Sequence, residues 1–495
     1  MKRLTMFARW TYSSVLLIAL LCGVASCSKY DNPKEEANSM PPIFPDYINV
    51  TIPENIAPLN FEVKGAKHIV ATISVRGKQE MKLSGESKIS FPIKDWRKLL
   101  SATAGDKLDV TVDVWTDQNP DGVRYKSFSI YVSKDKIDPW VAYRLIPPGY
   151  ELWNRMGIFQ RNLEDFEQSP IILNSQNNKG CVNCHSFCNY NPKTFLFHAR
   201  GEGGSTMLTI NGQTRKLPID QIGPKKSATY PYWHPSGNFI AFSSNVTRQS
   251  FYGISMNKIE VYDLNSDLII YDVRNNKVIT DKRFCNNADW ETFPTFSPDG
   301  KYLYLCVAHL GISDAERAKI QSYISQIKYA IIRVPFDTRT GELGSRVDTI
   351  FSPYRDGGSG SLPRISPDGH YLMYTWASCA TFPIQHKEAD LKMIDLRTMK
   401  YVDTSILNSK DVDSYHSWSS NGRWIVFSSK RIDGKYTRLY FAHVDKDGRF
   451  TRPFMLPQKD PEQNGALLYA YNIPEFIKGK VHLDKDEVAK MFRVN

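Results

Sequence analysis

Cysteine is scarce in this sequence: the 495 residues contain eight, and their wide spacing excludes a dense disulfide framework. Two of them form a motif discussed below, and two lie near the N-terminus. The other four are Cys188, Cys285, Cys306 and Cys379. One or two disulfides could form among these four, and the sequence does not reveal which cysteines would pair.

Long hydrophobic runs are also missing. The apolar run at residues 15–23 is too short to span a bilayer, and three basic residues precede it, which is typical of an export signal. The next four residues, Val-Ala-Ser-Cys, resemble a bacterial lipobox, in which Cys27 is acylated and becomes the mature N-terminus. The alternative is an ordinary signal peptide cut after Ser26. We expect residues 1–26 to be removed and residues 27–45, polar and rich in proline, to form a flexible tether.

There is no dense run of lysine or arginine. The formal charge of +11 falls to +8 without the three basic residues of the export signal, and this charge is spread along the chain. An exported protein of this kind is not expected to bind nucleic acid. We expect a solvated surface that attracts anionic lipid, glycan or a protein partner.

The segment Cys181-Val-Asn-Cys184-His185 is a complete C-x-x-C-H, the signature of covalent haem c attachment. Two cysteines at this spacing can form thioethers with the two haem vinyl groups, and the adjacent His185 can then bind the iron as an axial ligand. The alternatives are a zinc site, a redox C-x-x-C or coincidence. A zinc site needs a second Cys/His pair at ligand spacing, and none is nearby.

Three residues are candidates for the second axial iron ligand, which could also be absent. If residues 187–194 form a hairpin, His198 lies nearly opposite His185 on the paired strand, too close for a trans ligand. His416 occupies the same repeat position as His185, as shown below. We expect the first and last recognised repeats to become neighbours when the propeller closes, so that His416 faces His185 across a gap wide enough for a haem. Our order is therefore His416, His198, Met207, or an open position.

Four stretches repeat a turn-forming pattern and each precedes an apolar strand. They are Tyr230-Pro-Tyr-Trp-His-Pro-Ser-Gly237, Phe293-Pro-Thr-Phe-Ser-Pro-Asp-Gly300, Leu362-Pro-Arg-Ile-Ser-Pro-Asp-Gly369 and Tyr415-His-Ser-Trp-Ser-Ser-Asn-Gly422. A fifth, degenerate copy begins at Cys184, so that the C-x-x-C-H motif replaces the start of a repeat. The excess length between repeats includes a helical-looking stretch at residues 312–327.

The repeats resemble the TolB-like β-propeller family. The resemblance implies an all-β toroid over residues 185–475, with five to seven blades and six favoured. Together with the C-x-x-C-H, the chain resembles a group of exported lipoproteins labelled cytochrome c biogenesis-like. Neither resemblance implies a particular chemistry, because propellers host many functions.

The remaining segments flank this propeller. Residues 46–135 contain short β-branched and aromatic runs separated by turns, which predicts a small β-sandwich that acts as a spacer. Residues 136–184 lack a strand period, and we expect a connector of short helices and loops that ends in the haem motif. Residues 476–495 are expected to form a C-terminal tail.

Three classes of function follow. The first is a haem-bearing electron-transfer or ligand-binding lipoprotein at the outer membrane, with a redox or other envelope protein as partner. The second is a non-enzymatic binding or scaffold propeller. The third, a hydrolase, is disfavoured because no G-x-S-x-G occurs. Four acids that precede repeats could point into the channel, although turn and cap roles are favoured: Asp289, Glu291, Asp356 and Asp413.

Overall fold

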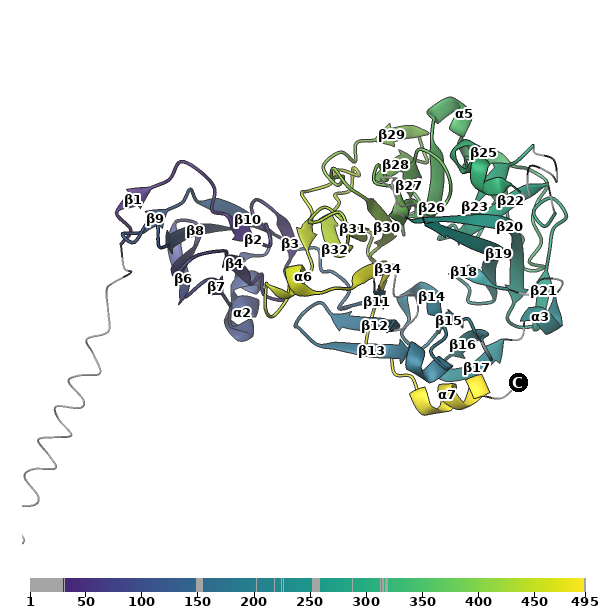
Figure 1. Ribbon diagram of the computed structural model, residues 1–495, viewed down its shortest axis with the longest axis horizontal. Coiled ribbons are helices and arrows are strands. Elements are labelled where there is room, and N and C mark those ends of the chain that lie inside the picture. Colours follow the sequence, from purple (N-terminus) through teal and green to yellow (C-terminus); the bar gives the residue numbers. More distant parts are fainter. Residues whose placement is uncertain are drawn as a thin grey trace, which may run out of the picture.

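The computed structural model contains a small β domain joined to a ring of β-sheets (Figure 1). The residues that it describes are 30, 32–147, 155–201, 203–217, 219–223, 225, 227–251, 259–286, 288–311, 313, 316 and 319–493. The predicted lipidation site, Cys27, lies outside them. Among the described residues, no helix is long and apolar enough to cross a membrane.

Six four-stranded antiparallel sheets form the blades of a β-propeller. The innermost strands are β14 (Val182–Phe187), β18 (Thr229–Trp233), β22 (Asp289–Phe296), β26 (Ser359–Ile365), β30 (Asp413–Trp418) and β34 (Ala470–Ile477). The second strands, in the same order, are β15 (Phe195–Ala199), β19 (Phe239–Phe251), β23 (Tyr302–His309), β27 (Tyr371–Ala377), β31 (Trp424–Ser429) and β11 (Trp140–Ile146). The third strands are β16 (Thr206–Ile210), β20 (Ile259–Asp272), β24 (Ala330–Pro335), β28 (Asp390–Asp395), β32 (Arg438–His443) and β12 (Gly157–Asn162). The outer strands are β17 (Gln213–Leu217), β21 (Lys277–Ile279), β25 (Asp348–Phe351), β29 (Lys400–Val402), β33 (Phe454–Met455) and β13 (Gln168–Leu173).

The blade that closes the ring, blade 1, combines the two ends of the propeller sequence. Its strands β11, β12 and β13 come from the segment that we expected to be a connector, and its innermost strand β34 comes from near the C-terminus. Trp140 pairs with Ile477 and Ile146 with Ala470, antiparallel. The propeller therefore begins at residue 140, not at residue 185. Blades 2 to 6 follow in chain order from β14.

The Ser-Pro-Asp-Gly turns join first to second strands as the repeats predict. In blade 4, Ser297 Oγ donates to Asp299 at 2.6 Å and accepts from the backbone of Tyr302 at 3.0 Å. Gly300 has φ 72°, a conformation that favours glycine.

Each innermost strand also carries a β-bulge at the same repeat position. The bulged residue has φ near +50° although it is not glycine, and the next residue is proline or histidine. The six bulged residues are Cys184, Tyr230, Phe293, Leu362, Tyr415 and Ile473. Strained backbone and bulges are common at functional sites, so the six bulges on the innermost strands indicate a candidate site at the centre of the ring.

The N-terminal domain contains two sheets and a helix. The seven-stranded sheet comprises β1 (Glu35–Glu36), β3 (Thr51–Pro53), β5 (His68–Val75), β6 (Lys78–Gly85), β8 (Lys107–Trp115), β9 (Val123–Arg124) and β10 (Phe128–Ser133). The smaller sheet comprises β2 (Ile43–Phe44), β4 (Phe61–Val63) and β7 (Lys88–Ile89), and α2 (Ile93–Thr103) packs beside it through Trp96 and Leu100. Strands β1 and β2 lie in the segment expected to be a tether, so part of that segment is folded onto the domain.

This domain is more than a spacer, because it shares a hydrophobic core with the propeller. Buried residues of both domains form one cluster, which includes Trp96 of α2 and Phe476 of β34. Trp424 Nε1 donates to Asp135 O at 2.9 Å, and Ser420 Oγ donates to Asp138 at 2.7 Å. Blade 6 and the N-terminal domain are therefore held together by both apolar and polar contacts.

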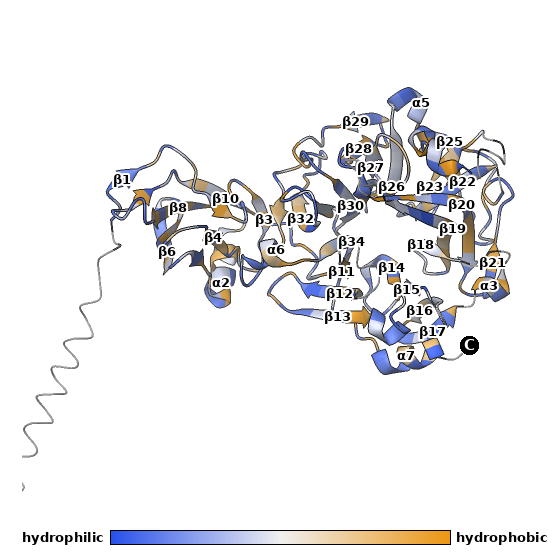
Figure 2. Cartoon of the chain, viewed as in Figure 1, coloured by the Kyte–Doolittle hydropathy of each residue, from blue (hydrophilic) through white to orange (hydrophobic). Residues whose placement is uncertain are grey.

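Short helices fill the remaining loops. They are η1 (Asn174–Asn177), η2 (Cys188–Tyr190), α3 (Ile219–Ile222), η3 (Ile320–Gln326), α5 (Pro353–Asp356), η4 (Pro383–Gln385), α6 (Gln463–Ala466) and α7 (Lys485–Arg493). The predicted C-terminal tail includes α7, which buries Val488 and Phe492 and carries both hydrophilic and hydrophobic residues (Figure 2). In the helical-looking stretch at 312–327, η3 accounts for the described helical turns.

Candidate functional site

The six bulges surround a cavity of about 320 Å³ at the centre of the ring. All six innermost strands contribute to its wall, together with the turns that follow them in blades 2 to 5. The aromatic residues in the wall are Phe187, Tyr190, Tyr230, Tyr232, Trp233, Phe293, Phe296, Tyr415 and Trp418. The volume is at the lower end of the range, about 300–1,000 Å³, that is usual for small-molecule sites.

Aromatic packing supports one part of the wall from behind. The rings of Tyr230 and Phe293, two of the bulged residues, lie 4.6 Å apart. Phe382, from the loop after β27, is buried against both, with ring distances of 6.0 and 6.3 Å. The loop therefore supports the cavity wall at these two blades.

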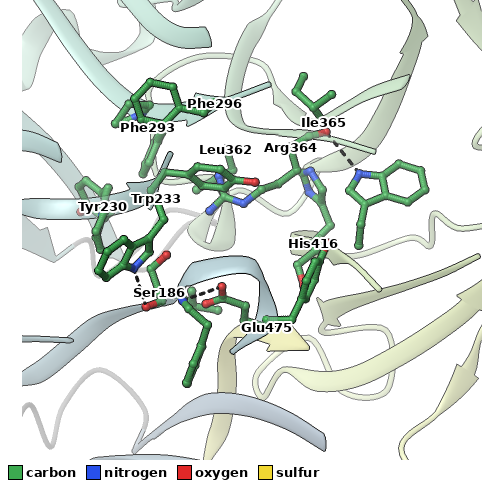
Figure 3. A pocket seen from close by; sticks show the side chains of 18 of the residues that line it. Ser186, Tyr230, Trp233, Phe293, Phe296, Leu362, Arg364, Ile365, His416 and Glu475 are labelled. Atoms are coloured by element: carbon green, nitrogen blue, oxygen red, sulfur yellow. Dashed lines mark hydrogen bonds between the residues drawn. The ribbon is translucent and has the colours of Figure 1, made fainter. Parts of the chain in front are cut away.

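The polar edges of two tryptophans are already hydrogen-bonded within the protein. Trp233 Nε1 donates to Ser186 O at 3.2 Å, and Trp418 Nε1 donates to Arg364 O at 3.3 Å (Figure 3). These bonds fix the orientation of both rings. The cavity thus meets mainly carbon surface from these two residues.

Arg364 is the only lysine or arginine among the described lining residues. Its guanidinium carbon lies 5.2 Å from the centre of the Tyr232 ring, and Nη1 donates to Pro363 O at 2.9 Å. Among the described residues, no carboxylate forms an ion pair with it within 4 Å. Nε and Nη2 have no hydrogen bond to a described residue and remain available to a ligand.

Glu475 is the only acidic residue among the described lining residues. One carboxylate oxygen accepts from the backbone N–H of Phe187 at 2.9 Å. Burial raises the pKa of Glu475 to about 8, against the opposing effects of that hydrogen bond and of Arg364. At neutral pH the side chain is therefore mostly an uncharged acid that can donate a hydrogen bond.

Two buried histidines line the cavity next to bulged residues. Burial lowers the pKa of His185 to about 3, with a further contribution from Arg144, so its ring is neutral. Neither ring nitrogen of His185 makes a well-formed hydrogen bond to a described residue. The nearby backbone of Ile473 raises the pKa of the ring, which opposes part of the effect of burial. His416 Nε2 contacts Met373 O at 3.0 Å, and its Nδ1 has no hydrogen-bond partner among the described residues.

The predicted haem-attachment residues are divided between two environments. Cys184 and His185 line the cavity, as the repeat alignment predicts. Cys181 is not among the described lining residues; it packs in an apolar cluster with Met156 and Phe197. Covalent haem of the usual kind needs both thiols at one cavity surface. The residues in this arrangement do not fit that requirement, because one thiol would have to leave the core.

The candidate second axial ligands are also distributed differently from our expectation. His198 pairs with Asn183, not His185, because the bulge removes residues 184 and 185 from the ladder. It contacts Thr206 Oγ1 at 3.0 Å and does not line the cavity. Met207 is buried in the same apolar cluster as Cys181. Of the three, only His416 reaches the cavity.

His185 and His416 are not on neighbouring blades. They belong to blades 2 and 6, and blade 1 lies between these because β34 completes it. The expectation that the first and last recognised repeats become neighbours is wrong for this reason. The sixth copy, Ile473-Pro474-Glu475, was missed because no Ser-Pro-Asp-Gly turn follows it.

None of the four loop acids is among the described residues that line the cavity. Asp356 accepts from the backbone of Ser352 at 2.9 Å, and Asp413 pairs with Arg431 at 2.7 Å. Asp289 contacts His309 at 3.0 Å. Glu291 is fully buried, and burial together with Asp267 raises its pKa to about 9. Turn, ion-pair and core roles account for these residues.

The described cysteines are all free thiols, and the described residues include no group of three or more histidine, cysteine or acidic side chains arranged to hold a metal ion.

The sequence reasoning missed Arg364 and Glu475. Both occupy the second position after a bulged residue, where the other blades have Ser186, Tyr232, Thr295 and Ser417. A comparison of this one position across all repeats would have identified both residues. The comparison requires the sixth repeat to be recognised, and only its Ile473-Pro474 dipeptide matches the pattern of the other repeats.

Comparisons with known proteins identify no family for this chain. No protein-family profile matches the chain, and no curated protein sequence matches it. Among solved structures, an oligogalacturonate lyase in complex with manganese shares 13% identity over 62% of this chain and 73% of its own, with a TM-score of 0.36. The β-propeller domain of the Trilobed protease from Pyrococcus furiosus shares 11% identity over 70% of this chain and 81% of its own, with a TM-score of 0.33.

A puromycin-hydrolysing peptidase from Mycobacterium tuberculosis shares 12% identity over 72% of this chain and 52% of its own, with a TM-score of 0.35. The chain therefore spans about half the length of that peptidase.

Proposed function

We propose that this protein is a lipid-anchored propeller of the bacterial cell envelope that binds a small organic ligand in its central cavity, without catalysing a reaction. The observation that carries the proposal is the cavity wall at the six bulges. It combines largely aromatic surface with one guanidinium group and one carboxyl group that retain free hydrogen-bonding positions. This combination is typical of small-molecule sites.

The anchor and the location are proposed from the sequence. The lipobox-like segment ending in Cys27 and the preceding export signal support attachment to the outer membrane. Cys27→Ser is expected to abolish acylation, and incorporation of labelled palmitate into the wild type checks it. A wild-type protein that incorporates no label after processing would contradict the proposed anchor.

Binding in the cavity can be tested by intrinsic fluorescence, because Trp233 and Trp418 line the wall. The full chain, as the cell processes it, would be titrated with a panel of aromatic acids, aromatic alcohols, sugars and sugar acids. We expect at least one compound to quench the fluorescence saturably. The affinity for this compound, obtained from the titration, should fall at least about tenfold in Trp233→Leu. The matched control is Trp376→Leu, a tryptophan of blade 5 that lies outside the cavity. Equal loss in both variants would contradict the location.

Covalent haem attachment is a second candidate. The sequence motif is complete, and Cys184, His185 and His416 meet at one cavity. It requires Cys181 to leave its apolar cluster. Co-expression with haem-maturation enzymes followed by haem staining of denaturing gels tests it, with Cys181→Ala and Cys184→Ala in separate variants. Absence of stain in the wild type would exclude covalent haem. Stain that depends on both cysteines would contradict the small-ligand proposal.

A further inference from the structure

The one arginine and the one acidic residue among the described lining residues, Arg364 and Glu475, lie on blades 5 and 1 and form no ion pair with each other within 4 Å. Figure 3 shows Arg364, Glu475 and His416 around the same space. An arginine that is not neutralised by a carboxylate in a largely aromatic site attracts an anion, and its planar fork matches a carboxylate.

We propose that the central cavity selects a small organic carboxylate that carries a ring with an apolar face, its carboxylate bound by Arg364 and its ring packed against the tryptophan and phenylalanine wall. This inference rests on the proposed function and adds the class of ligand. The ring could be aromatic or a sugar, since both present a face that packs on aromatic side chains.

Glu475 determines how this selectivity depends on pH. Its carboxyl group is mostly protonated at pH 6.5, and in that form it can donate a hydrogen bond to a ligand. It becomes an anion as the pH rises through about 8. The second negative charge in the cavity then repels a bound carboxylate.

The neighbouring titratable groups whose pKa is shifted keep their charge state as the pH rises through about 8. Burial holds the pKa of His185 and His416 at about 3, and it raises the pKa of Tyr190, Tyr232 and Tyr415 above the usual value. Burial also raises the pKa of Cys188, beside Glu475, to about 11. Of the described groups in this part of the cavity whose pKa is shifted, Glu475 is therefore the one that titrates near pH 8.

The protein can be tested with matched pairs of charged and neutral probes. Phenylacetate and glucuronate are the anions, and 2-phenylethanol and glucose are their neutral counterparts. At pH 6.5 we expect one anion to bind at least about tenfold more tightly than its neutral counterpart, since a charge-assisted bidentate contact contributes at this scale. Which anion binds distinguishes an aromatic acid from a sugar acid.

Variants separate the two proposals. Arg364→Met is expected to equalise the affinities of anion and neutral probe, whereas Arg333→Met is not. Arg333 is a matched control because it also lies over a tyrosine ring, Tyr302 at 4.7 Å, but outside the cavity. The affinity of the wild type for the anion is expected to fall about tenfold between pH 6.5 and 9.5, and Glu475→Gln is expected to remove this dependence.

Binding of the neutral probes as tightly as the anions would overturn the inference and leave the proposed function standing. Binding of none of the four probes, or anion binding that is unchanged in Arg364→Met, would also overturn the inference. Saturable quenching by other compounds of the fluorescence panel would then decide the proposed function separately.

Discussion

A buried histidine, His386, connects blade 5 to the β19–β20 hairpin of blade 3. His386, after β27 in blade 5, contacts Glu260 of β20 at 3.2 Å through Nε2 and Glu388 at 3.3 Å through Nδ1. Burial lowers the pKa of His386, but the hydrogen bonds to the two glutamates outweigh this effect and raise it to about 9. We therefore predict that this contact stabilises the docking of the β19–β20 hairpin onto blade 5 in a pH-dependent manner.

The sign and the magnitude follow from linkage. The folded-state pKa of His386 lies above its ordinary value of 6.5, so the stabilisation is complete below pH 6.5 and is lost as the pH rises through about 9. This difference between the folded-state and ordinary pKa of His386 corresponds to about 3 kcal/mol, or roughly a hundredfold in the equilibrium between the docked and the open hairpin. His386→Gln keeps a polar side chain but cannot be protonated, so it should remove the dependence.

Hydrogen exchange of the backbone amides in the outer half of β19 and β20, Thr247–Ser250 and Ile259–Asp263, measures this opening. The ratio of exchange rates between His386→Gln and the wild type cancels the intrinsic effect of pH on exchange. We expect a ratio of roughly one hundred at pH 6.5 that approaches one at pH 9.5. His370→Gln, an exposed histidine of the same blade, should give a ratio near one throughout. A ratio for His386→Gln that does not change with pH would refute the reasoning.

Three further substitutions test the fold. Phe476→Ala in β34, fully buried between the ring-closing blade and its neighbours, should lower the free energy of unfolding in urea by about 3–5 kcal/mol, whereas the exposed Leu468→Ala should change it by less than about 0.5 kcal/mol. Gly300→Ala should lower the free energy of unfolding by about 1–3 kcal/mol more than Gly369→Ala in the same assay. Both glycines have positive φ, but only a Cβ at Gly300 would clash, since it would lie 2.3 Å from His234 Nε2. Equal losses in the two variants would contradict this. Asp138→Ala should cost about 1–3 kcal/mol by leaving Ser420 without its acceptor, and unchanged stability would show that this bond does not hold the domains together.

The propeller could be predicted from the sequence because its turns repeat. Ser-Pro-Asp-Gly, present in two repeats, and its variants His-Pro-Ser-Gly and Ser-Ser-Asn-Gly set the φ values of a tight turn locally, so four copies were visible without any tertiary information. Blade 1 was missed for the opposite reason. Its innermost strand β34 and its second strand β11 are separated by more than 300 residues, so no turn joins them and no local pattern marks the blade.

The cavity was predicted only in part. The alignment of Cys184 with Phe293 correctly placed His185 at the channel. The bulge, which depends on non-local strand pairing, could not be predicted, and it moved His198 out of register with His185. The separation of Cys181 from Cys184 also depends on packing between blades 1 and 2, which the sequence motif does not encode.

A crystal structure of the full chain, purified from the envelope and soaked with the tightest-binding probe, tests the central claim most directly. The account predicts electron density for one small molecule in the cavity, with a carboxylate within about 3 Å of Arg364 and a ring against Trp233. Density for a haem joined to Cys181 and Cys184, or a cavity that stays free of the probe while the probe binds elsewhere, would contradict it.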